Sequence, residues 1–148
     1  MNYENDIIEM LKSLKVNNIY ATEEFEKDIT KLVLTNVKKF VRNFYRDIRR
    51  KNFEEYNRYE RLSLNKPQKE LLKGKALYRY EYRENSNLKC IYVIENENTM
   101  QKTILLCAFN EDGDKTKGKN SYKDNINRAI RIYLNTIGNW GDKDVNWL

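Results

Sequence analysis

Residues 76–109 read ALYRYEYRENSNLKCIYVIENENTMQKTILLCAF, and this stretch decides the fold. Its first part alternates between two sets of side chains, Tyr78, Tyr80 and Tyr82 on one face and Arg79, Glu81 and Arg83 on the other. Such a period of two is typical of a β-strand. Apolar runs at residues 88–94 and 103–109 follow, each after a polar turn. The stretch therefore predicts an antiparallel meander of three strands, with the last strand covered on both faces.

Helical patterns surround these strands. Residues 6–14 form a short helix candidate, and Thr22 can cap a longer one that starts at Glu23. From there apolar residues recur every three or four positions, at Phe25, Ile29, Leu32, Val33, Val37, Phe40, Val41, Phe44 and Ile48. No glycine or proline interrupts residues 23–66, so either one helix continues through residues 53–59 or the chain breaks near residues 51–52 and folds back. Ser121 can cap a last helix that ends near Gly138.

The fold class expected from this order is α+β. We expect a three- or four-stranded antiparallel sheet, with the long N-terminal helix or helical hairpin on one face and the C-terminal helix beside it. The 148 residues suit a single domain, divided into an N-terminal extension (1–22), a core (23–138) and a tail (139–148) that holds Trp140 and Trp147. A chain of this length buries about 68–70% of its unfolded surface, enough for a core without disulfides or metal.

Composition excludes several kinds of chemistry. The chain has no histidine and no pair of cysteines at metal-ligand spacing, which argues against histidine-based catalysis and against a metal site. We expect no cofactor. No apolar run approaches the roughly 20 residues of a membrane-spanning helix, and the first residues are acidic, unlike a secretory signal. A cytoplasmic protein without membrane contacts is the expectation.

The two cysteines, Cys90 and Cys107, fall on neighbouring predicted strands. If the turn between those strands is centred between Asn98 and Thr99, the two residues lie directly opposite each other. Two buried, reduced thiols are the favoured interpretation, and a disulfide is the alternative.

The positive charge is concentrated in residues 38–51, whose cations are Lys38, Lys39, Arg42, Arg46, Arg49, Arg50 and Lys51. With Asp47 as the only acid, this segment has a net charge of +6, which equals that of the whole chain. A basic face on a helix whose other face is apolar predicts binding to phosphate backbones, or to an acidic protein partner. The alternative is a solvated helix face without a ligand.

A second group of cations follows the strands. Lys89 is the one charged residue of the run 88–94, and the loop after the last strand carries Lys115, Lys117 and Lys119 before Tyr122. Lys89 either reaches solvent from the edge of the sheet or joins these residues in one phosphate site near the start of the last helix. The tyrosine row of the first strand and Tyr92 either stack on bases or pack beneath a helix, and packing is favoured.

Three segments resemble the RelE/HigB-type toxins of the RelE/ParE superfamily and their phage-derived relatives. Residues 72–80, LKGKALYRY, resemble the linker and first core strand of that family. Residues 88–93 are similar to its second strand, where an arginine usually stands at the position of Lys89, and residues 104–109 are similar to its apolar third strand. The resemblance covers roughly residues 25–133.

This resemblance implies a metal-independent endoribonuclease that cleaves mRNA, commonly on the ribosome, and is neutralised by a small antitoxin protein. Carried over to this chain, Lys89 would stabilise the phosphate, Lys115 or Lys119 would add positive charge, and Tyr122 would assist proton transfer. RNA or the ribosome would bind the basic face. Two alternatives stay open: a non-catalytic phage or mobile-element protein that binds nucleic acid or a host protein through residues 38–51, and a toxin-fold inhibitor of another host enzyme.

Overall fold

The computed structural model describes residues 3–50, 60–82, 84–85, 87–97, 100–111 and 121–138. In chain order these residues form α1 (Tyr3–Leu14), a 3-10 turn (Lys15–Asn17), β1 (Ile19–Ala21), α2 (Glu23–Leu32), α3 (Val37–Arg50), α5 (Lys66–Leu71), β2 (Tyr78–Glu81), β3 (Leu88–Glu97), β4 (Met100–Asn110) and α6 (Tyr122–Gly138). The α+β class expected from the sequence is confirmed, and no helix in the described ranges is long and apolar enough to cross a membrane.

The sheet has the strand order β1-β4-β3-β2. Strands β2, β3 and β4 form the predicted antiparallel meander. Strand β1 pairs with β4 in parallel, so the sheet is mixed, and the expectation of a purely antiparallel sheet is wrong at this edge. Three residues are too few to display a period of two, which is why the sequence pattern did not reveal β1.

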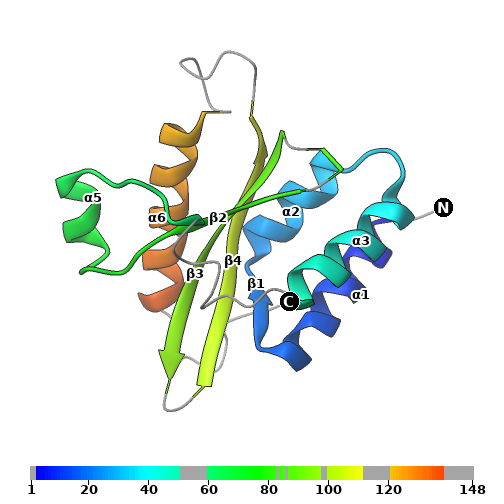
Figure 1. Cartoon of the computed structure of the whole chain (residues 1–148), viewed down its shortest axis with the longest axis horizontal. Helices are drawn as coiled ribbons and strands as arrows, with labels where there is room; N and C mark the ends of the chain where they lie inside the picture. The colour runs from blue at the N-terminus through cyan, green and yellow to red at the C-terminus, as the bar shows by residue number, and fades with distance from the viewer. Residues whose placement is uncertain are drawn as a thin grey trace.

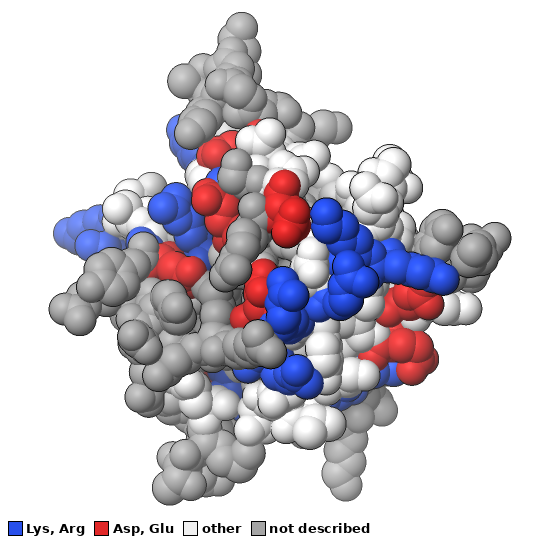
Figure 2. All heavy atoms as spheres, turned by 45° about the vertical axis from the view of Figure 1, so that its right-hand side comes forward, with Lys and Arg blue, Asp and Glu red and all other residues white. Residues whose placement is uncertain are grey.

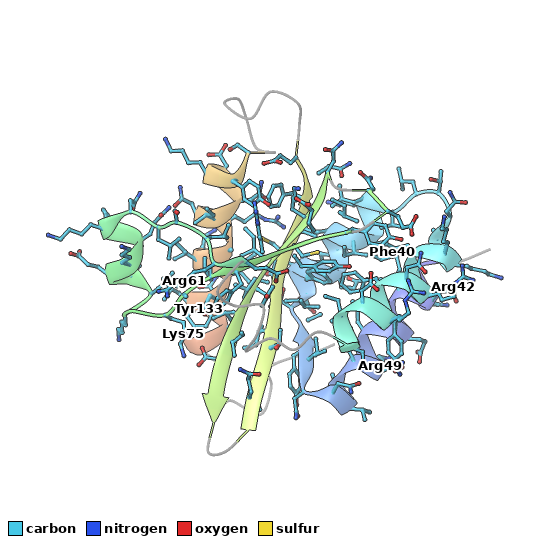
Figure 3. The ribbon with its side chains drawn as sticks, viewed as in Figure 1. Phe40, Arg42, Arg49, Arg61, Lys75 and Tyr133 are labelled. Atoms are coloured by element: carbon cyan, nitrogen blue, oxygen red, sulfur yellow. The ribbon has the colours of Figure 1, made fainter. Side chains whose placement is uncertain are left out.

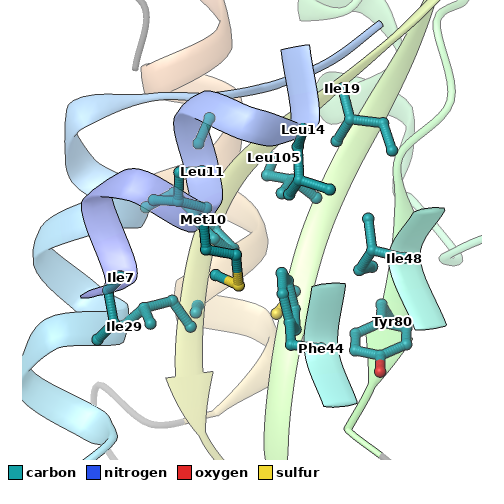
Figure 4. Close-up of a cluster of buried hydrophobic side chains, with 14 of the residues drawn as sticks. Ile7, Met10, Leu11, Leu14, Ile19, Ile29, Phe44, Ile48, Tyr80 and Leu105 are labelled. Carbon is teal, nitrogen blue, oxygen red and sulfur yellow. The ribbon is translucent and has the colours of Figure 1, made fainter. Parts of the chain in front are cut away.

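Helices cover both faces of the sheet (Figure 1). Helices α1, α2 and α3 lie on one face, and their buried side chains form a core with Tyr80, Cys90 and Leu105 (Figure 4). Helix α6 lies on the opposite face, over Ile91 and Leu106. The prediction that the C-terminal helix lies beside the N-terminal helices is therefore wrong. The last strand is buried on both faces, as its continuous apolar run predicts.

Residues 3–21, which the sequence placed in an N-terminal extension, contribute to this core. The buried residues of α1 are Ile7, Met10, Leu11 and Leu14, and Ile19 and Ala21 of β1 are buried with them. The 3-10 turn after α1 is capped by Asn18, whose φ of 60° turns the chain into β1. Asparagine adopts this left-handed conformation more readily than most residues do.

The predicted long helix is two helices. Helix α2 ends at Leu32, and α3 begins at Val37 after a connection in which Asn36 has a φ of 53°. The predicted alternatives, one continuous helix or a break near residues 51–52, both missed this connection, and residues 51–59 lie outside the described part. The apolar spacing continues across the connection because Ile29 and Val37 are buried in the same core. Periodicity alone therefore contains no sign of the break.

The strand register separates the two cysteines. Glu97 lies opposite Met100, and the predicted turn at Asn98 and Thr99 falls outside the described residues. A β-bulge then shifts the register, so that Cys107 pairs with Ile91 and Leu105 pairs with Tyr92. Leu106 is the additional residue of the bulge. Cys90 consequently faces α1–α3 and Cys107 faces α6, and both are buried free thiols, as predicted.

The tyrosine row packs against α3, which confirms the favoured interpretation. The ring of Tyr82 contacts Phe40 edge-on at 5.1 Å between centroids, and the ring of Tyr80 contacts Phe44 at 5.6 Å. Tyr92 is fully buried and stacks with Tyr78. The rings of Tyr80, Tyr82 and Tyr92 are buried, so they are not available to stack on bases.

Candidate functional site

The basic face of α3 points to solvent. The helix buries Val37, Phe40, Phe44 and Ile48 at spacings of three and four, which turns the charged side chains away from the core. We call the following residues the cationic face of α3: Lys38, Lys39, Arg42, Arg46 and Arg49. All of them are exposed except Arg46, which is half-buried. Lysine and arginine side chains gather on this side of the molecule (Figure 2), and Arg42 and Arg49 project from α3 in Figure 3.

Only part of this charge is compensated. Lys39 Nζ lies 3.6 Å from Glu84 Oε2, and Arg46 Nε lies 3.5 Å from Asp47 Oδ1. Lys38 and Arg42 make no ion pair with any residue that the structure describes. The Arg50 side chain and Lys51, also predicted to bind nucleic acid, lie outside the described part. The cationic face therefore keeps an excess of positive charge in the solvent.

A groove of about 440 Å³ runs between α1 and α3. The α1 side of the groove is formed by Asp6, Glu9, Met10 and Ser13, and the α3 side by Lys38, Val41, Arg42 and Tyr45. The groove thus has carboxylates on one wall, cations on the other and apolar side chains between them. The guanidinium of Arg49 lies over the Tyr45 ring, 4.6 Å from its centroid, and extends the row of cations.

The second predicted site lies on the α6 face, at the end of the sheet where β3 begins. Lys89 pairs in register with Glu81 of β2 and forms an ion pair with its carboxylate. Its Nζ also lies 3.9 Å from Glu111 Oε1, just after β4. The lysine side chain is only 6% exposed, so the expectation that it reaches solvent is wrong. Burial of an ammonium group requires such partners because desolvation of an unpaired charge is costly.

Tyr122, the first residue of α6, lies in the same cluster. Its ring contacts Phe109 edge-on, with 5.1 Å between centroids, and its buried hydroxyl makes no hydrogen bond of normal geometry with any described residue. Burial raises the pKa of the phenol to about 12; the nearby Arg79 guanidinium opposes this rise, and the carboxylates of Glu111 and Glu81 add to it. Tyr122 is therefore protonated at neutral pH and can donate a proton but cannot serve as a base.

Lys89 and Tyr122 thus share the neighbours Glu81 and Glu111, as a common site requires. We call Arg79, Glu81, Lys89, Glu111 and Tyr122 the polar cluster. Its two cations and two carboxylates balance. Sequence reasoning placed Glu81 and Arg79 on the same strand face but did not connect them to Tyr122. Lys115 and Lys119, predicted to add charge here, lie outside the described residues, and their role stays a prediction.

A further charged contact joins α2 to α6. Asp28 accepts a hydrogen bond from the Ala108 backbone N–H at 2.9 Å and binds Arg128 through both carboxylate oxygens at 2.6 and 2.7 Å. Strand β1 pairs only with residues 103–105 of β4, so Asp28 satisfies a backbone donor farther along the same edge. These partners are 80 and 100 residues apart in sequence, and no local pattern signals the contact.

Glu95 of β3 binds two side chains at the other end of the sheet face that α6 covers. It binds Lys75 Nζ at 2.7 Å and accepts a hydrogen bond from the Tyr133 hydroxyl. Figure 3 shows Lys75 and Tyr133 on this side of the sheet. Burial, together with the hydrogen bond to Glu95, raises the pKa of Tyr133. All these groups are paired, which indicates a structural role. The described ranges contain no group of three histidine, cysteine or acidic side chains that could hold a metal ion.

Comparison with known proteins identifies no relative. No family model matches this chain, and neither a curated protein nor a solved structure matches it. The likeness to RelE/HigB-type toxins therefore stays a prediction from the three sequence segments, and the geometry of the two sites is the basis for a functional hypothesis.

Proposed function

We propose that this protein binds RNA through the cationic face of α3. The main support for this proposal is that the face is exposed and that Lys38 and Arg42 form no ion pair with a carboxylate in the described part of the chain. Unpaired surface cations in a row attract a phosphate backbone because binding releases its condensed counterions. Arginine also forms bidentate contacts with phosphate oxygens.

The arrangement along the helix supports this proposal. Lys38, Arg42 and Arg49 lie at spacings of four and seven residues, which places them on one stripe of α3. Eleven residues of helix span about 16 Å, so the stripe can follow several consecutive phosphates of one strand. If three to five cations contact phosphate, the logarithm of the affinity for single-stranded RNA should fall with the logarithm of salt concentration with a slope of about −2 to −3.5.

Charge reversal tests the proposal. In the variant Arg42→Glu/Arg46→Glu/Arg49→Glu we expect binding of a labelled RNA oligonucleotide to fall at least about a hundredfold at low salt, measured by fluorescence anisotropy. The matched control is Lys31→Glu/Lys66→Glu/Lys69→Glu, which makes the same change in net charge at exposed positions of α2 and α5. A thermal melt establishes that both variants fold. Equal binding by the wild type and the α3 variant at low salt would contradict the proposal.

A second candidate function is RNA cleavage of the toxin type, and the polar cluster favours it. In the proposed step, exposed Glu81 accepts the proton of a ribose 2′-hydroxyl, whose oxygen then bonds to the adjacent phosphorus. The bond from phosphorus to the 5′-oxygen breaks, and Tyr122 donates its proton to that oxygen. Arg79 stabilises the charge of the phosphorane, and Lys89 holds Glu81 in place through their ion pair. The step requires no metal ion.

RNA cleavage of the toxin type would also imply a protein partner and a site of action in the cell. A toxin of this type would be neutralised by a small antitoxin protein and would act on mRNA at the ribosome in the cytoplasm. The two functions are compatible, because the cationic face of α3 and the polar cluster lie on opposite faces of the sheet. RNA held by the first could reach the second around the β2 edge, because β2 is an outer strand of the sheet.

A further inference from the structure

The groove between α1 and α3 has a chemistry that phosphate binding does not explain. We infer that it accepts an unpaired base of a single-stranded nucleic acid whose phosphates lie along the cationic face of α3. This inference rests on the proposed function and adds to it the class of nucleic acid and the location of the base.

The size and lining of the groove suit a base. Its volume of about 440 Å³ lies within the range of small-molecule sites, and Met10, Val41 and Tyr45 are its large apolar and aromatic lining residues. Planar bases bind to such surfaces by stacking on aromatic rings and by burying their apolar faces. Tyr45 is only half-buried and lines the groove, while the Arg49 guanidinium lies over its ring, so a base would stack on the part of the ring that Arg49 leaves uncovered. By contrast, Tyr80 and Tyr82 are packed beneath α3.

The two walls of the groove carry opposite charges, which match the phosphate and the base of a nucleotide. Lys38 and Arg42 form the α3 wall, next to the row where phosphates would lie. Asp6 and Glu9 form the α1 wall, and both side chains are exposed. Carboxylate oxygens accept hydrogen bonds from the exocyclic amino groups of cytosine, adenine and guanine, whereas they repel phosphate. A strand on α3 would thus point its bases, and not its backbone, toward α1.

The carboxylates of Asp6 and Glu9 also disfavour the binding of a duplex. A duplex has two phosphate backbones, and in an A-form RNA duplex they face each other across a wide, shallow minor groove. A duplex with one strand on α3 would bring phosphates of its second strand near Asp6 and Glu9. Lys12 Nζ lies 3.9 Å from Glu9 Oε1 and offsets part of this charge, but Asp6 makes no ion pair within the described ranges. The bases of a duplex are also paired and cannot enter the groove.

The experiment compares three probes on the wild type by fluorescence anisotropy: a single-stranded RNA, a duplex of the same sequence, and a strand of equal length made of abasic nucleotides. We expect the single-stranded RNA to bind about tenfold more tightly than the other two probes. The variant Tyr45→Leu, which keeps an apolar side chain but removes the ring, should lose this tenfold advantage while its affinity for the abasic strand is unchanged. Tyr20→Leu is the matched control, since Tyr20 is a half-buried tyrosine on β1 with Lys102 near its ring.

The outcomes separate this inference from the function on which it rests. If the wild type binds none of the probes at low salt, the proposed function fails. If it binds all of them equally, or if Tyr45→Leu retains the preference for single-stranded RNA, phosphate binding stands and the base site is overturned. Loss of binding to the abasic strand in Tyr45→Leu would also overturn the inference, because the ring would then act by supporting Arg49 rather than by stacking on a base.

Discussion

The cationic face of α3 and the polar cluster both contain lysine and arginine, but their lysines differ in burial and in ion pairing. Lys38 and Arg42 are exposed and lack ion-pair partners in the described part, whereas Lys89 is buried between the carboxylates of Glu81 and Glu111. Charge that remains in solvent is available to a ligand, and buried charge is largely neutralised by its own protein. A lysine in the sequence thus indicates a binding site only when its burial and its partners are known.

The largest expected effect tests whether the polar cluster also has a chemical function. If it cleaves RNA, Tyr122→Phe removes the proton donor and should lower the cleavage rate on the order of 10²–10⁴-fold. Purified wild type and variant would be compared on a labelled RNA, and mRNA 5′ ends would be mapped after induced expression in cells. Tyr133→Phe is the control, because that hydroxyl binds Glu95 at the other end of the same face.

Two results would contradict a catalytic role for the polar cluster. If Tyr122→Phe cleaves RNA as fast as the wild type, the polar cluster is not the catalytic centre. If the wild type neither cuts RNA nor slows growth, the protein should be treated as a binding protein, and the cluster as part of its stable core.

The next prediction concerns the two cysteine thiols, which we expect to be unreactive because they are buried. Burial raises the pKa of the Cys107 thiol to about 12, so its reactive thiolate is much rarer near neutral pH than that of an exposed cysteine. We expect neither Cys90 nor Cys107 to react with a thiol reagent in the native protein, and both to react in urea. Rapid labelling of the native protein at both positions would contradict the burial of these strands.

The smallest effect compares the two lysine environments through stability. Lys89→Met removes the buried ammonium group that contacts the Glu81 and Glu111 carboxylates and should lower the free energy of unfolding by about 3 kcal/mol at neutral pH. Arg42→Met, the exposed counterpart, should change the free energy of unfolding by less than about 0.5 kcal/mol. Urea denaturation at neutral pH measures both values.

A second substitution identifies the cause of the loss at Lys89. Adding Glu111→Gln to Lys89→Met removes the buried carboxylate charge and should recover part of the lost stability. If Lys89→Met costs no more than Arg42→Met, the two regions do not differ in the way described above.

The sequence showed the elements whose patterns are local. The meander was predictable because alternation in residues 76–83 and apolar runs in the next two strands are properties of consecutive residues. The cationic face of α3 was predictable for the same reason, since residues 37–50 contain both its apolar and its charged stripe. Strand β1 and the connection around Asn36 were missed because one is too short for a period and the other leaves the period intact.

By itself, then, the sequence determined the α+β class, the central meander, the buried thiols and the position of the excess charge, because each of these follows from the spacing of neighbouring side chains. Only the tertiary structure decided that α6 covers the opposite face, that a bulge separates Cys90 from Cys107, and that Asp28 and Arg128 join α2 to α6. It also decided that Lys89 is buried between Glu81 and Glu111. The reason is that desolvation and pairing depend on residues that are distant in the chain and meet only when the sheet and helices pack together.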